Sequence, residues 1–230
     1  MNRATLQALQ ELRAAGTAAI VLTEMDGAWQ TLLNADLQTL IGPAPGQELL
    51  ALTTDALGSD RSRVVDCDGE RVFVQIFSQP LRMVIIGAVH IAQFLAPMAV
   101  LADYQVVVVD PRRSFAADER FPGVSMRKVW PDDALQELRP DARTAIVTLT
   151  HDPKIDDPAL IEALKSPAFY IGSLGSRRTH AKRVQRLLEA GCSEQSITRI
   201  HAPVGLNIHA KSPAEIAVSV LAQVTEVLRA

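Results

Sequence analysis

The chain has 230 residues, 48% of them hydrophobic, and a formal net charge of −3. A chain of this length and composition holds one large or two small folded domains, which excludes a disordered or fibrous protein. A slightly acidic chain has no general attraction for nucleic acid or for anionic membranes, so we expect any anion site to be local and to take a small ligand.

Cysteines and apolar runs bear on the compartment. Cys67 and Cys192 lie far apart and belong to no C-x-x-C or Cys/His cluster, so we expect neither a disulfide framework nor a zinc site and assign no metal ligands. No apolar run approaches the roughly 18 residues of a membrane span. Residues 1–12 have the pattern of an amphipathic helix, not of a signal segment. We therefore predict a cytoplasmic protein with no membrane partner.

The first 79 residues predict a small α+β domain. The Asp26-Gly27 and Asp68-Gly69 pairs are turn sequences that join neighbouring strands into two hairpins. The predicted elements are helices over residues 1–12 and 47–57 and strands over residues 18–22, 29–33, 63–67 and 71–77, with a break at 42–46. The domain ends at Ser78-Gln79-Pro80, where the pattern changes.

From residue 80 to residue 230, apolar strands alternate with helices. This alternation is typical of βαβ units, so we predict an α/β fold with a Rossmann-like, doubly wound, mostly parallel sheet. Strands are expected at 82–86, 105–109, 125–129, 145–149, 168–171 and 197–200; helices begin near Val89, Pro131, Asp157 and Ser176, and a last one covers 213–228. The connection over residues 111–123 has no predicted element, and loops of that length are often functional.

The first βα unit resembles a nucleotide site. Gly87 follows a strand, and Asp110 comes 23 residues later at the end of the next strand, where a Rossmann protein places the acid that holds ribose hydroxyls. Val89, however, stands where the backbone must approach a pyrophosphate. The alternatives are that Gly87 serves only a tight turn, that Asp110 pairs with a neighbouring arginine such as Arg112, and that His90 caps or packs the helix.

Polar residues follow the later strands as well. Thr150, His151 and Asp152 come just past a buried strand, at the edge where open α/β sheets bind ligands. The histidine and aspartate are candidates for an acid/base pair or for ligand orientation, or they simply form a turn. His201, with Asn207 and His209, follows the last strand, and these side chains either line the same pocket or face solvent.

The segment "YIGSLGSRRTHAKR" carries the strongest signal of an anion site. It predicts a strand, a turn on Gly172 and Gly175, and a helix capped by Ser176 with Arg177 and Arg178 in its first turn. The helix dipole is positive there, so carboxylates are favoured and two arginines are not. We therefore predict that the helix N-terminus and both arginines bind a phosphate. The alternative is that the arginines are solvated or paired with acids.

Five ordered blocks resemble the XdhC/CoxI family, the maturation factors of xanthine dehydrogenase and carbon monoxide dehydrogenase. The blocks are "GAVHIAQ", "VVVVDPRRSFAADERFP", "TLTHDPKIDDPAL", "YIGSLGSRRTHAKR" and "IHAPVGLNIHAKSPAEIA". The resemblance implies a chaperone, and not an enzyme, that binds the molybdenum cofactor as cargo and delivers it to a molybdenum hydroxylase apoenzyme. It also suggests a cysteine desulfurase as a further partner and a homodimer. Together with the patterns above it gives as cofactor-binding residues Gly87, His90, Asp110, Arg112, Thr150, His151, Asp152, Gly172, Gly175, Ser176, Arg177, Arg178 and His201.

The chain departs from the family pattern at two places. Val89 replaces the usual glycine of the first block, and Cys67 lies in "VVDCDGE" and not in the family's Gly-Cys-Gly-Gly setting, so no cysteine ligand for molybdenum is transferred. Two other functions stay open. Asp110 favours an NAD(P)-dependent oxidoreductase, which Val89 opposes, and a scaffold that has lost its ligand would explain the departures. Phe115 and Phe121 are either docking contacts for the apoenzyme or core residues.

Overall fold

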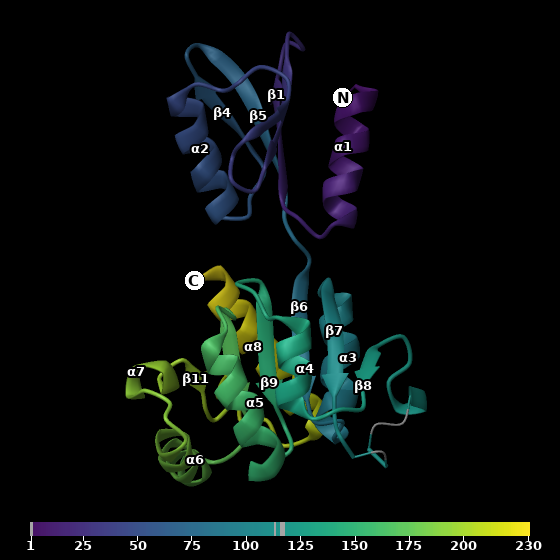
Figure 1. Ribbon diagram of the computed structural model, residues 1–230, viewed down its shortest axis with the longest axis vertical. Coiled ribbons are helices and arrows are strands. Elements are labelled where there is room, and N and C mark those ends of the chain that lie inside the picture. Colours follow the sequence, from purple (N-terminus) through teal and green to yellow (C-terminus); the bar gives the residue numbers. More distant parts are fainter. Residues whose placement is uncertain (1, 113, 116–117) are drawn as a thin grey trace. The chain divides into compact units, whose positions relative to one another are not determined.

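The computed structural model describes residues 2–112, 114–115 and 118–230. The chain divides into two compact units, residues 1–79 and residues 80–230 (Figure 1). Among the described helices, none is both long enough and apolar enough to cross a membrane.

The first unit is an antiparallel sheet with a helix on each face. Its sheet has the strand order β3-β2-β1-β5-β4. One face packs against α1 around Leu9 and Leu32, and the other packs against α2 around Leu33 and Leu49. The elements are α1 (Arg3–Ala14), β1 (Ala19–Glu24), β2 (Gln30–Asn34), β3 (Thr39–Ile41), α2 (Gln47–Gly58), β4 (Arg63–Cys67) and β5 (Glu70–Phe77).

Both predicted hairpins of this unit form, since β1 pairs with β2 and β4 pairs with β5. Strand β3 was not predicted. It is a three-residue edge strand with no buried residue, and its register on β2 is irregular. A strand of this kind carries no alternation of apolar and polar residues, which is the signal that sequence analysis relies on.

The second unit is a six-stranded sheet in which all pairs are parallel. Its strand order is β11-β10-β9-β6-β7-β8, so the order reverses between β6 and β9, as in a Rossmann fold. The strands are β6 (Leu81–Ile86), β7 (Tyr104–Val109), β8 (Ser125–Arg127), β9 (Thr144–Thr148), β10 (Tyr170–Ser173) and β11 (Ile200–His201).

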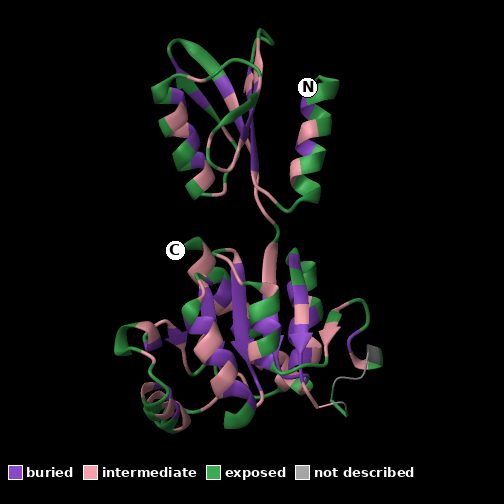
Figure 2. Ribbon diagram, viewed as in Figure 1, coloured by how far each residue is buried: buried purple, intermediate pink, exposed green. Residues whose placement is uncertain are grey.

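Helices cover both faces of this sheet, as Figures 1 and 2 show, which confirms the predicted doubly wound α/β class. Helices α3 (His90–Leu101) and α8 (Pro213–Arg229) pack on one face, around residues such as Leu95 and Val220. Helices α4 (Pro131–Leu138), α5 (Pro153–Lys165) and α6 (Arg177–Glu189) pack on the other, around Leu160 and Leu187. The central strands are buried between the two layers (Figure 2).

Two predicted boundaries were wrong. Helix α5 begins at Pro153, not near Asp157, because Asp152 caps it by accepting a bond from the Lys154 N–H and Pro158 is tolerated inside the helix. The strand expected at 197–200 is reduced to the two residues of β11, since Ser193 caps a short helix, α7 (Glu194–Ile197). The long loop also holds a 3₁₀ turn, η1 (Asp118–Arg120).

Candidate functional site

A cleft of about 280 Å³ lies between the first turns of α5 and the stretch of α6 from Arg178 to Arg186. Both helices follow strands of the sheet, β9 and β10, so the cleft is at the carboxyl edge, where α/β folds bind ligands. Its lining residues are His151, Pro153, Asp156, Asp157, Arg178, Thr179, Lys182, Arg183 and Arg186. Four of these nine side chains are cations, which makes the cleft an anion-attracting surface.

Helix α6 presents three cations in a row along its length. Ser176 caps this helix, its hydroxyl accepting a bond from the Thr179 N–H. Arg178, Lys182 and Arg186 are spaced four residues apart and so lie one above another along one stripe of the helix. The free N–H groups of the first turn add a partial positive charge at the same end.

One cation of the row is already neutralised. Arg186 holds Asp157 of α5 through two parallel bonds, Nε to Oδ2 at 2.5 Å and Nη2 to Oδ1 at 3.0 Å. This contact raises the pKa of the Arg186 guanidinium and links α5 to α6. Arg178 and Lys182, in contrast, are exposed and have no acid partner among the described residues. The positive charge that no acid neutralises therefore lies at the exposed end of the cleft, which we call its outer end.

The carboxylate of Asp156 fixes the turn between β9 and α5. It is 1% exposed, and it accepts bonds from the Thr150 hydroxyl at 2.6 Å, the Thr150 N–H at 3.3 Å and the His151 N–H at 3.0 Å. His151 has a φ of 62°, a conformation that these bonds stabilise. Burial raises the pKa of Asp156, although the Thr150 hydroxyl and the charge of Arg183 partly oppose it.

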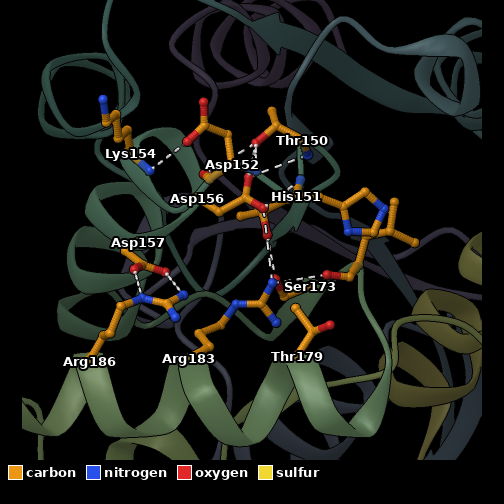
Figure 3. A network of polar contacts seen from close by, with 12 residues as sticks. Thr150, His151, Asp152, Lys154, Asp156, Asp157, Ser173, Thr179, Arg183 and Arg186 are labelled. Carbon is orange, nitrogen blue, oxygen red and sulfur yellow. Dashed lines mark hydrogen bonds and ion pairs between the residues drawn. The ribbon is translucent and has the colours of Figure 1, made fainter.

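Arg183 lies at the buried end of the cleft, which we call its inner end. Its side chain is 2% exposed, and its Nη2 donates to the Leu174 carbonyl at 2.9 Å. The same atom is 4.0 Å from Oδ2 of Asp156, an ion pair without a hydrogen bond. Nε and Nη1 have no hydrogen-bond partner among the described residues. Figure 3 shows the guanidinium rising from α6 toward Asp156, beside the closed Arg186–Asp157 pair.

The predicted nucleotide site at the first βα turn is occupied by the protein's own side chains. Asp110 is fully buried and accepts four bonds: from the Ala88 N–H at 2.8 Å and from the N–H, Nε and Nη2 of Arg112 at 2.8–2.9 Å. Arg112 also stacks on Phe115, 4.1 Å from the ring centroid. Arg120 donates to the Ala88 carbonyl at 2.9 Å. No lone pair of Asp110 is left for a ribose hydroxyl in this arrangement.

The family follows from a direct comparison of sequences. Residues 83–224 match the family model of the XdhC Rossmann domain. The chain belongs to the XdhC family. The match confirms the resemblance drawn from the five sequence blocks, and it covers the whole region that forms the cleft.

This XdhC-family chain is similar in sequence to three curated relatives. It is 35% identical over 178 residues to the uncharacterized protein YqeB of Escherichia coli K12, a match over 75% of this chain and 31% of YqeB. It is 40% identical over 99 residues to the molybdenum cofactor insertion chaperone PaoD of E. coli K12, covering 43% of this chain and 30% of PaoD. It is 30% identical over 156 residues to a probable xanthine dehydrogenase subunit of Bacillus subtilis 168, covering 67% and 45%. The chain thus spans less than half the length of these relatives.

A solved structure shares the fold of both units. The crystal structure of a xanthine dehydrogenase from Bacillus halodurans superimposes with a TM-score of 0.76 at 24% sequence identity, covering 99% of this chain and 64% of that one. At this identity the comparison supports the architecture alone.

The structure brings part of the predicted XdhC-family site together. Arg178 and His151 line the cleft, Ser176 and Asp152 cap its two helices, and Thr150 bonds to Asp156. The pKa of Arg112 is raised mainly by its hydrogen bonds to Asp110, and the nearby charges of Asp152 and Asp156 raise it further. Arg177 is exposed and outside the lining. The two arginines therefore do not line one spot.

Three glycines predicted for the site lie where a side chain would collide with neighbouring atoms. Gly87 has a φ of +108°, and a Cβ there would lie 2.5 Å from the Thr150 methyl carbon. A Cβ on Gly172 would lie 2.6 Å from Val204, and one on Gly175, at a φ of +140°, 3.1 Å from Thr179. These positions let strand ends and loops approach closely at the edge that holds the cleft.

Two predicted histidines lie away from the cleft lining. His90 is exposed in the first turn of α3, its ring 5.5 Å from that of Phe94. His201 stacks on Tyr170 with ring centroids 4.7 Å apart. Burial lowers the pKa of His201 and Glu226 of α8 partly offsets this, which places the ring on the α8 face.

Most of the residues that line the cleft were not predicted from the sequence. Lys182 and Arg186 continue the four-residue spacing of Arg178, a pattern that is visible in the sequence. Arg183 is four residues before the buried Leu187, so it falls on the inward face of α6. A charged residue at a buried helical position was the available signal.

Proposed function

We propose that this chain is a maturation factor that binds the molybdenum cofactor and delivers it to a molybdenum hydroxylase apoenzyme such as xanthine dehydrogenase. The observation that carries the proposal is the cationic cleft, whose buried Arg183 has two nitrogens without partners among the described residues. Molybdopterin ends in a phosphate or a diphosphate, the group that such a cleft attracts. The names of PaoD and of the B. subtilis relative support the same role.

The two ends of the cleft serve binding and release. Arg183 provides fixed donors at the inner end, while Arg178 and Lys182 are exposed at the outer end, near the first turn of α6. A cargo held by its phosphate keeps its other end accessible to an acceptor protein, which delivery requires. We assign no catalytic residue. A cytoplasmic location stays a prediction from the cysteines and apolar runs, and a cysteine desulfurase partner and a homodimer stay predictions from the resemblance.

The two competing functions have less support. An NAD(P)-dependent oxidoreductase needs a free acid at Asp110, and Arg112 takes that carboxylate. A scaffold without a ligand leaves unexplained why a buried arginine keeps donors that no described residue accepts, since buried polar groups are almost always hydrogen-bonded.

The proposal is tested by cofactor retention and transfer. The full chain is incubated anaerobically with free molybdenum cofactor, desalted, and assayed for pterin by fluorescence after oxidation. We expect retained pterin and activation of a cofactor-free molybdenum hydroxylase when the loaded chain is added. An Arg178→Gln, Lys182→Gln variant should retain less, and Lys165→Gln, at the far end of α5, serves as the matched control. No retention by the wild type would reject the proposal.

A further inference from the structure

Given the proposed function, two neighbouring ion pairs of the cleft differ in a way that bears on ligand contact. Arg183–Asp156 and Arg186–Asp157 both join α6 to α5. In the second pair, two hydrogen bonds of 2.5 and 3.0 Å close the contact. In the first, the nearest atoms are 4.0 Å apart and no bond forms. The more buried of the two arginines is thus the less satisfied.

Asp156 does not satisfy Arg183 because its carboxylate is held 4.0 Å away, beyond hydrogen-bond distance. Three donors from Thr150 and His151 hold the carboxylate in the β9–α5 turn. Nε and Nη1 of Arg183 are therefore left without an acceptor among the described residues, on a side chain that lines the cleft. A wholly structural role at this position would be filled by an apolar residue, as at Leu187 one turn later on the same face.

The charges of the cleft indicate what the acceptor is. With Arg186 and Asp157 neutralising each other, Arg178, Lys182 and Arg183 face the single acid Asp156. Three cations against one acid leave a surplus of two positive charges. A phosphate monoester carries about two negative charges at neutral pH, and a carboxylate carries one.

We propose that Arg183 contacts the ligand directly, and that Nε and Nη1 bind the oxygens of a doubly charged phosphate group, with Arg178 and Lys182 closing the outer side. Two forms of the cargo supply such a group: a terminal phosphate monoester and the diphosphate of a dinucleotide. The chemistry at Arg183 is the same in both.

The first test observes Arg183 in the intact wild-type chain. Arginine Nε–H resonances are recorded by NMR while inorganic phosphate is added, and the Arg183 signal is assigned with Arg183→Lys. We expect that signal to shift with saturation and the signal of Arg199, which donates to backbone carbonyls away from the cleft, to stay in place. An Arg183 signal unmoved at saturating phosphate would overturn the proposal.

The second test measures affinity by calorimetry. Arg183→Met should weaken phosphate binding roughly tenfold or more, the effect of one charge-assisted hydrogen bond, and Lys165→Met should leave it unchanged. Acetate should bind more weakly than phosphate. Phenyl phosphate and ADP-ribose represent the monoester and the diphosphate, and the tighter competitor identifies the form. Unchanged phosphate affinity in a folded Arg183→Met variant would also overturn the proposal.

Cofactor retention separates this inference from the proposed function. If the wild type binds phosphate through Arg183 but retains no molybdenum cofactor, the subsite stands and the maturation role fails. If wild type and Arg183→Met retain the cofactor equally, the maturation role stands and the subsite fails.

Discussion

Two buried carboxylates at the same sheet edge have pKa values that move in opposite directions. Burial raises the pKa of both. At Asp110 the bonds from Arg112 and Ala88, with the charge of Arg112, outweigh burial, so the pKa falls below the ordinary 3.8. At Asp156 burial dominates and the pKa rises above 3.8. The difference follows from distance: the Arg112 guanidinium is 2.8 Å from Asp110, whereas that of Arg183 is 4.0 Å from Asp156.

This contrast predicts opposite pH effects of two matched substitutions. Because the folded pKa of Asp110 is lowered, its stabilisation is present above pH 3.8 and is lost as the pH falls below it. Asp110→Asn should therefore reduce the free energy of unfolding by about 1.5 to 3 kcal/mol at pH 7, and by less in acid. Because the folded pKa of Asp156 is raised, wild-type stability is lost as the pH rises through it, and Asp156→Asn removes that loss.

Urea unfolding of wild type and both variants between about pH 3 and pH 8 checks this pair. The stability gap to wild type should widen with pH for Asp110→Asn and narrow with pH for Asp156→Asn. A gap that fails to widen with pH for Asp110→Asn would show that the Arg112 contact does not control the titration of Asp110, and a gap that fails to narrow for Asp156→Asn would contradict the raised pKa of Asp156.

Gly87 packs the first βα turn against the β9–α5 turn, whose Thr150 and His151 bond to Asp156. Its φ of +108° and the 2.5 Å approach of the Thr150 methyl both oppose a side chain. We expect Gly87→Ala to cost about 2 kcal/mol or more. Gly123→Ala, at a φ of +74° with nothing within 4 Å, should cost only about 1 kcal/mol. Adding Thr150→Ser removes the methyl and keeps the hydroxyl, so it should recover part of the loss. Strictly additive effects in this double-mutant cycle would exclude a direct contact.

At the scale of elements, the loop over residues 111–123 contains two aromatic residues, Phe115 and Phe121, that looked alike in the sequence but lie in different environments. Phe121 is 3% exposed and packs in the core under α3, so its interpretation as a docking contact was wrong. Phe115 is 38% exposed and stacks on Arg112. It stays a predicted contact for the apoenzyme.

Alanine substitutions distinguish the two rings. Phe121→Ala should lower the free energy of unfolding by about 3 to 5 kcal/mol, because it opens a cavity in the core. Phe115→Ala should lower it by about 1 kcal/mol or less, the value of one exposed cation–π contact. Thermal unfolding gives both numbers, and activation of the apoenzyme by Phe115→Ala tests docking apart from stability. Equal losses of stability in the two variants would contradict the structure, in which Phe121 is buried and Phe115 is not.

The same contrast shows what sequence patterns can predict here. Strands such as β6 and β9 contain short apolar runs, and a helix cap such as Ser176 acts locally, so both were predicted. The start of α5 was missed because Pro158 has the same preference for a first turn as Pro153. The role of Arg183 depends on how far it lies from Asp156 across the α5–α6 interface, a tertiary fact that neither segment contains.

At the scale of the whole molecule, the cores of the two units are separate. The clusters around α1 and α2 contain only residues of unit 1–79, and the two clusters of the Rossmann unit contain only residues from 81 onward. Every residue lining the cationic cleft also comes from the second unit.

A fragment of residues 80–230 should therefore fold alone and bind phosphate as the full chain does. A domain of about 150 residues buries about 70% of the surface its unfolded chain exposes, enough for independent stability. Both core clusters of the unit and its complete parallel sheet are retained in the fragment. Circular dichroism should show one cooperative thermal transition, and calorimetry should give a phosphate affinity within about twofold of the full chain, a difference below about 0.5 kcal/mol. A folded fragment that no longer binds phosphate would mean that residues 1–79 complete the site, and delivery would then require both units.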